Sequence, residues 1–184
     1  MKIKKILTGV VIVLFLIVAG GLIFINIFSK KGLPDYNQKV SIPGLEQKVT
    51  IYRDKYAVPH IYAENEHDLY LATGYCMAQD RMWQMDLIRR VTMGRLSEIF
   101  GEKMLKADRL FRTLDITKKS KLVLAKSSDE LRGHLDAYAQ GVNYYIQEHK
   151  GNFPLEYNIL GYVPDSWEPI HTLNLIGYMA WDLA

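Results

Sequence analysis

The chain has 184 residues, of which 49% are hydrophobic and 23% charged, and its formal net charge at pH 7 is +3. This composition is ordinary for a globular protein, and the length favours one main domain. The charge is mild and forms no basic stripe with interleaved aromatic residues, so nucleic acid is not an expected partner. The single cysteine, Cys76, excludes an intrachain disulfide and a zinc cluster built from cysteines.

Residues 1–31 are predicted to be a membrane anchor. A mostly apolar run at positions 6–28 follows several lysines. As a helix rising about 1.5 Å per residue, this run is long enough to cross a hydrocarbon core of about 30 Å. A cleaved signal peptide is the alternative, although its apolar region normally has only about 7–15 residues. The N-terminal lysines predict that this end stays in the cytoplasm and that the body of the protein lies outside, in an extracytoplasmic position.

The next segments predict a linker, a β-hairpin and a long helix. Residues 32–48 contain prolines and glycines without a sustained period, which indicates a linker. Residues 49–63 have strand character on both sides of a polar turn, so a β-hairpin or two short strands are expected. Asn65 is expected to cap a helix that continues, with an interruption at Gly94, through residues 66–100.

The second half of the chain also predicts helices. Residues 102–126 show a weaker pattern, helical only in their first part. Ser127 and Glu130 form a capping-box pattern ahead of an apolar stripe with helical spacing, and that helix should end near Gly151. A last apolar helix is predicted to begin near residue 170, and its apolar side needs a surface to pack against. The chain is therefore predicted to be the N-terminal part of a larger protein. One side of that helix carries Leu173, Ile176, Met179 and Leu183.

The stretch AQDRMWQMDLIRR, residues 78–90, mixes charged and apolar side chains in an unusual way. Charges on a helix that is covered on several sides must be paired or hydrogen-bonded. Asp80 with Gln84, and Asp86 with Arg90, lie one helical turn apart. We therefore expect a central helix whose polar side chains connect neighbouring segments. A surface helix with weak ion pairs is the alternative.

Short catalytic motifs are missing from the sequence. It contains no G-x-S-x-G, P-loop, G-x-G-x-x-G or H-E-x-x-H pattern. Cys76 lies on an apolar helical stripe, which is typical of a buried structural thiol. The histidines are scattered, and no two of them have ligand spacing on one helix face, so no metal site is predicted. Acids such as Asp80 and Asp86 stand near arginines, which favours ion pairs over acid–base catalysis.

Several ordered stretches within residues 49–184 resemble the α chain of the penicillin acylase (penicillin amidase) family. They are, in order, YRDKYAVPHIYA, GYCMAQDRMWQM, GRLSEIFG, AYAQGVNYYI and FPLEYNILGYVPDSWEP. The resemblance implies an N-terminal nucleophile hydrolase with an αββα fold, made as a precursor that cuts itself. Its nucleophile would be a serine at the new N-terminus of a β chain, activated by that serine's own α-amino group. No catalytic residue is therefore expected in this chain.

The resemblance also implies one substrate-binding residue. In the family, the α chain supplies a wall of the acyl pocket with the pattern Gly-x-Met-Ala, which Gly177, Met179 and Ala180 match, so Met179 is the candidate. Asp182 departs from the pattern, because the family carries an arginine there that would help bind a substrate carboxylate. This departure argues against penicillin as substrate. The family's calcium ligand would fall after Ala184, so no cofactor is expected in this segment, while calcium is possible in the full-length protein.

These observations predict an α+β, mainly helical α-chain segment, incomplete over residues 49–184. It would belong to a precursor that hydrolyses the amide bond of an N-acylated small molecule: a β-lactam, an acyl-homoserine lactone or an N-acyl amino acid. Its partner would be the β chain of the same precursor, and the segment alone would be inactive. The alternative is a non-catalytic, membrane-tethered remnant or binding module.

Overall fold

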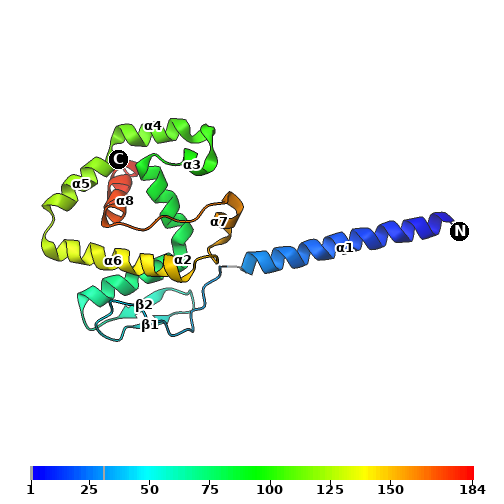
Figure 1. The fold of residues 1–184 in the computed structure, drawn as a ribbon, viewed down its shortest axis with the longest axis horizontal. Coiled ribbons are helices and arrows are strands. Elements are labelled where there is room, and N and C mark those ends of the chain that lie inside the picture. The colour runs from blue at the N-terminus through cyan, green and yellow to red at the C-terminus, as the bar shows by residue number, and fades with distance from the viewer. Residues whose placement is uncertain (1, 31) are drawn as a thin grey trace.

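The structure, a computed structural model, describes residues 2–30 and 32–184. Its body is mainly helical with one small two-stranded sheet, and helix α1 (Lys2–Lys30) extends away from that body (Figure 1). The mixed but mainly helical character expected from the sequence is confirmed. The remaining helices are α2 (Glu66–Met93), α3 (Ser97–Phe100), η1 (Glu102–Met104), α4 (Leu105–Leu114), α5 (Ile116–Lys126), α6 (Asp129–Glu148), α7 (Leu155–Leu160) and α8 (Pro169–Asp182).

The membrane anchor predicted for residues 1–31 is not supported. Residues 1 and 31 lie outside the described residues. Across the described part of the chain, none of the helices combines the length and the apolar character required to cross a membrane.

The predicted hairpin is confirmed. Strands β1 (Thr50–Arg53) and β2 (Pro59–Tyr62) pair antiparallel, with Thr50 opposite Tyr62 and Arg53 opposite Pro59. The Asp54 carboxylate closes the turn by accepting hydrogen bonds from the backbone N–H groups of Tyr56 (2.8 Å) and Val58 (3.0 Å). Pro59 has no N–H to donate and stands at the first position of its strand, where the sheet tolerates it.

The segment 32–48 has no helix or strand and lies along the body. The buried carboxylate of Asp68, in the first turn of α2, accepts hydrogen bonds from the backbone N–H groups of Glu46 (2.9 Å) and Gln47 (2.8 Å). The Tyr144 hydroxyl of α6 donates to the backbone carbonyl of Ser41 at 2.8 Å. Hydrogen bonds to both central helices therefore hold this segment in place.

Helix α2 begins and ends as its sequence predicts. The Asn65 side chain accepts the backbone N–H of Asp68 at 2.7 Å, and Gly94 ends the helix in the left-handed conformation, with φ 62°. No sequence pattern predicted the kink at Arg81, whose φ of −143° and ψ of 26° are not helical. This kink turns the second half of α2 relative to the first (Figure 1).

Helices α2 and α6 form the centre of the body. They run in the same direction, because Glu66 pairs with His134 near their N-termini while Tyr75 bonds Glu148 further along. Two glycines permit a close crossing. A Cβ on Gly74 would meet the Tyr138 carbonyl oxygen at 2.1 Å, and one on Gly141 would meet the Leu71 carbonyl oxygen at 1.9 Å.

The region before α6 departs from the prediction in two ways. The weakly patterned residues 102–126 are helical nearly throughout, as η1, α4 and α5. The N-cap of α6 is Ser128, whose hydroxyl accepts the N–H of Leu131 at 3.2 Å, and not Ser127. The reason is that the Ser127 hydroxyl donates back to the Val123 carbonyl at 2.9 Å, at the end of α5.

Candidate functional site

The buried charges of α2 hold the loop that leads into α8. Asp86 is fully buried and accepts hydrogen bonds from Arg89, Arg90 (3.3 Å) and the Tyr162 hydroxyl (2.8 Å). Arg89 also donates to the backbone carbonyls of Asp165 and Ser166, each at 3.0 Å. The expected polar network of a central helix is thus confirmed for Asp86 and Arg90. It connects the second half of α2 to the start of α8.

The start of α8 is fixed by side chains on either side of it. Pro169 occupies its first turn, and His171 Nδ1 accepts the backbone N–H of Glu168 at 2.9 Å. Burial is the main cause that lowers the pKa of His171 to about 4, so the imidazole is neutral at neutral pH. Asn143 of α6 accepts the backbone N–H of Trp167 at 2.6 Å and donates to its carbonyl at 2.9 Å. These contacts set the direction in which α8 leaves the body.

The inner side of α8 packs against α5 and α4. Leu173 is only 7% exposed, and a Cβ on Gly177 would come within 2.8 Å of the Ile116 side chain. The Trp181 ring meets Phe111 of α4 edge-on, with 5.1 Å between ring centroids. The Asn174 amide, fully buried, donates to the Thr117 hydroxyl at 3.2 Å.

The outer side of α8 carries an exposed apolar stripe, which we call the outer stripe. Its members are 38–80% exposed, and Met179, at the centre, is 51% exposed. The prediction that Leu173 shares this side is wrong, because six residues of α-helix place it about 120° away from Met179. Exposed apolar patches on proteins mark binding surfaces. The outer stripe comprises Leu175, Ile176, Met179 and Leu183.

Asp182 is the charged residue beside the outer stripe. It is exposed and lies one helical turn after Met179, in the last turn of α8. Among the described residues, its carboxylate has no ion-pair or hydrogen-bond partner. The candidate site therefore combines an adaptable thioether, exposed aliphatic side chains and one unpaired negative charge. The role of Met179 in binding a substrate stays a prediction.

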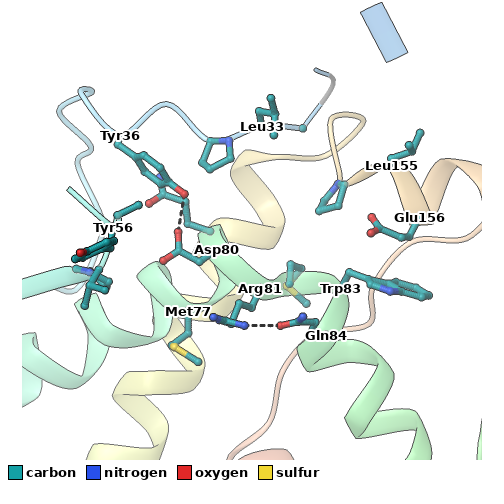
Figure 2. Close-up of a pocket in the computed structure, with 18 residues that line it drawn as sticks. Leu33, Tyr36, Tyr56, Met77, Asp80, Arg81, Trp83, Gln84, Leu155 and Glu156 are labelled. Atoms are coloured by element: carbon teal, nitrogen blue, oxygen red, sulfur yellow. Dashed lines mark hydrogen bonds between the residues drawn. The ribbon is translucent and has the colours of Figure 1, made fainter. Parts of the chain in front are cut away.

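A cavity of about 720 Å³ lies beside the kink of α2 (Figure 2). At its rim, Asp80 accepts hydrogen bonds from the Tyr36 hydroxyl (3.0 Å) and from Arg53 (2.8 Å), while Arg81 donates to Gln84 at 2.9 Å. The expected link between Asp80 and Gln84 is replaced by these bonds, because the kink at Arg81 separates the two side chains. Asp80 thereby joins β1 and the segment 32–48 to α2, which is a structural role.

The other potentially reactive groups are a buried cysteine and a cluster of possible metal ligands. Cys76 is buried as expected, and burial raises the pKa of its thiol to about 11. At the N-termini of α2 and α6, ligand atoms of Glu66, Glu130 and His134 lie within 4.8 Å of one another, a spacing that could hold a metal ion. No metal ligand was predicted from the sequence, so this group was missed. The i, i+4 spacing of Glu130 and His134 could have indicated two of the ligands, but the third, Glu66, lies on a different helix.

The chain is similar in sequence and in structure to known acylases. The structure matches the thermostable penicillin G acylase from Alcaligenes faecalis with a TM-score of 0.67 and 29% identity, covering 74% of each chain. Penicillin acylase 2 proenzyme from Pseudomonas sp. (strain SE83) is 39% identical over 78% of this chain, and the acyl-homoserine lactone acylase QuiP from Pseudomonas aeruginosa is 32% identical over 83%.

The penicillin amidase family profile matches residues 48–184. The chain belongs to this family, as its sequence motifs predicted. It spans only 18% of the length of the two Pseudomonas relatives and 18% of the penicillin G acylase from Escherichia coli, with which it shares 34% identity. Its sequence therefore corresponds to one part of those longer proteins.

Proposed function

We propose that this chain is the α-chain part of an amidohydrolase that cleaves the amide bond of an N-acylated small molecule. Membership of the penicillin amidase family carries the proposal, and the relatives named above are penicillin acylases and an acyl-homoserine lactone acylase. The structural match to the penicillin G acylase from Alcaligenes faecalis supports the same assignment.

The chemistry is supplied by a second, β chain cut from the same precursor. A serine at its N-terminus attacks the acyl carbonyl, and the serine's α-amino group takes the proton. An α-amino group titrates near pH 7.7–8.0, so it serves as a base at neutral pH without a histidine. The α chain contributes no nucleophile and is inactive alone. A calcium ion, where the full-length protein holds one, binds outside this segment.

The outer stripe of α8 is the contribution of this chain to the substrate site. Met179 lies at the centre of the stripe and is half exposed on a helix whose other side packs against α5 and α4. A thioether is flexible and polarizable, which suits a wall that contacts an acyl group. The fixed start of α8 then holds this wall in a constant position relative to the body.

The test is the activity of the protein expressed from its full coding sequence. We expect cleavage into two chains and hydrolysis of at least one of three substrates: penicillin G, an N-acyl-homoserine lactone and an N-acyl amino acid. Met179→Ala should lower kcat/KM about tenfold, on the order of what one lost apolar contact in a pocket costs. Residues 1–184 expressed alone should show no hydrolysis.

The control is Met77→Ala, which truncates a methionine that is 38% exposed on α2, away from α8. This variant should keep the kcat/KM of the unmodified protein. Equal kcat/KM for the two methionine variants would remove Met179 from the substrate site and leave the acylase proposal standing. A full-length protein that is neither cut nor able to hydrolyse any of the amides would overturn the proposal and favour a binding module.

A further inference from the structure

Three side chains with metal-binding atoms meet where α2 and α6 begin. Glu66 is in the first turn of α2, and Glu130 is in the first turn of α6, with His134 one turn further along α6. The Nε2 atom of His134 lies 3.0 Å from a carboxylate oxygen of Glu66, and one ligand atom from each of the three residues lies within 4.8 Å of the others. The cluster therefore draws its ligands from both central helices.

The imidazole of His134 is held in a fixed orientation. Its side chain is only 20% exposed, and the Tyr70 ring stacks on it with 4.4 Å between ring centroids and 22° between ring planes. Tyr70 lies one turn after Glu66 on α2, so the same helix supplies a carboxylate and the surface that orients the imidazole. A ring that is already oriented loses little freedom when its Nε2 atom binds an ion.

The two carboxylates of the cluster are not balanced by a lysine or an arginine. Within the described part of the chain, the imidazole of His134 is the one ion-pair partner of Glu66, and Glu130 has none. Arg132, two residues after Glu130, lies 3.7 Å from Asp129 and donates to two backbone carbonyls near the end of α5. The helix dipole favours an acid in each first turn, but it does not explain why both acids converge on one imidazole.

One imidazole nitrogen and two carboxylate oxygens suit a particular class of ion. Zn²⁺ binds histidine nitrogen and carboxylate oxygen at about 2.0–2.2 Å, so the ligand atoms of a tetrahedral site lie roughly 3.4 Å from one another. The 3.0 Å between Glu66 and His134 is close to this spacing. Glu130 is exposed, so a change of its rotamer brings the third ligand into place. Mg²⁺ and Ca²⁺ prefer sites that are built from oxygen alone.

We propose that Glu66, Glu130 and His134 bind a divalent transition-metal ion of the Zn²⁺ type, which connects the N-terminal ends of α2 and α6. Three protein ligands leave one tetrahedral position for a water molecule. The ion neutralises the two carboxylates and links the helices at a point beyond their close crossing at Gly74 and Gly141. This inference goes beyond the acylase function and does not depend on it, because none of the three ligands belongs to the outer stripe of α8.

The test is a calorimetric titration with Zn²⁺ of the protein expressed from its full coding sequence, after a chelator has removed transition metals. Excess Ca²⁺ stays in the buffer, so that any calcium site remains filled and cannot take up Zn²⁺. His134→Gln and Glu130→Gln should each raise the Kd for Zn²⁺ more than about tenfold, because losing a group that only orients a metal ligand already costs about 10–100-fold. Among the described residues, the Glu130 carboxylate makes no hydrogen bond or ion pair, so Glu130→Gln removes no contact that holds the fold.

The matched controls are His60→Gln and Glu102→Gln, which remove an exposed histidine from β2 and an exposed glutamate from η1. Both should keep the Kd of the unmodified protein, and circular dichroism should show the same fold for all four variants. Weaker Zn²⁺ binding in His134→Gln and Glu130→Gln, with both controls unchanged, establishes the site. A protein that binds no Zn²⁺, or one whose Kd is the same with and without these two substitutions, overturns the proposal.

Discussion

At the scale of single residues, Asp86 explains why charges interrupt the apolar helix α2. Its carboxylate is fully buried, and two arginines and a tyrosine hydroxyl donate to it. Burial lowers the pKa of Arg90, but the nearby carboxylate of Asp86 more than offsets this and raises the pKa, so the guanidinium stays charged. A buried charge is tolerated only with such partners. The charges of this helix are therefore internal connections to the 162–166 loop.

His171 should make stability depend on pH. The folded protein keeps this imidazole neutral down to about pH 4, whereas the ordinary pKa of a histidine, which applies to the unfolded chain, is 6.5. As the pH falls from 6.5 to 4, the unfolded state binds the proton first, so the free energy of unfolding decreases. We expect a loss of about 2 kcal/mol, after allowing for partial solvation. Urea denaturation at several pH values measures it.

His171→Gln should flatten this part of the pH profile, because the titrating group is gone. His60→Gln is the control: its side chain is 52% exposed, and the variant should keep the slope of the unmodified protein. The lowered pKa values of Asp68 and Asp108 act in a different window, because their stabilisation is lost as the pH falls below the usual carboxyl range. An unchanged slope in His171→Gln would contradict the assignment.

At the scale of elements, the crossing of α2 and α6 depends on glycine. Gly141→Ala would place a Cβ 1.9 Å from the Leu71 carbonyl oxygen, which belongs to the backbone of α2. Because a helix backbone cannot move aside cheaply, the two helices must separate. We expect the free energy of unfolding to fall by about 1–3 kcal/mol, the usual range for an overpacked core. Urea denaturation of the purified protein measures this change.

The same helix offers a matched control. A Cβ on Gly133 of α6 meets nothing within 4 Å. Gly133→Ala should therefore stabilise the protein by about 0.5–1 kcal/mol, since alanine loses less conformational entropy than glycine in a helix. Opposite signs for the two variants are the expected result. Equal effects would mean that helix propensity, and not the close crossing, decides the stability at Gly141.

At the scale of the whole molecule, the chain exposes apolar side chains that no other described residue covers. The outer stripe of α8 is exposed, and the described side chains of α1 at 11–18 are each more than half exposed. We expect the isolated chain to self-associate, and light scattering measures this association. Without residues 1–31 association should weaken but persist, and Ile176→Glu should then abolish it, because a charge in the stripe opposes burial.

The control for this experiment is Ile159→Glu in the shortened chain. Ile159 is 69% exposed on α7, outside the outer stripe, so its substitution should leave the remaining association unchanged. If the shortened chain is monomeric before any substitution, the outer stripe is not a surface that needs a partner. The proposed contact between α8 and a β chain would then lose its physical basis.

Many local features of this structure could be predicted from the sequence. The cap at Asn65, the left-handed end at Gly94, the hairpin and the apolar stripe of α6 each depend on neighbours in the chain, so sequence patterns predicted them. The family followed from ordered motifs for the same reason. Residues 102–126 were harder to read, because the two helices there meet at Asp115, a non-glycine residue in the left-handed conformation with φ 51°.

Contacts between distant segments were decided only by the tertiary structure. The pairing of Asp80 with Arg53 and that of Glu66 with His134 join side chains from different elements. The kink at Arg81 lies inside α2 and had no local sequence signal. The sequence by itself determined most of the helices, the hairpin and the family, and the candidate Met179 followed from the family resemblance. Which side of α8 is packed, and that Met179 and Asp182 face outward together, depended on how α5 meets α8, because burial is a property of the assembled fold.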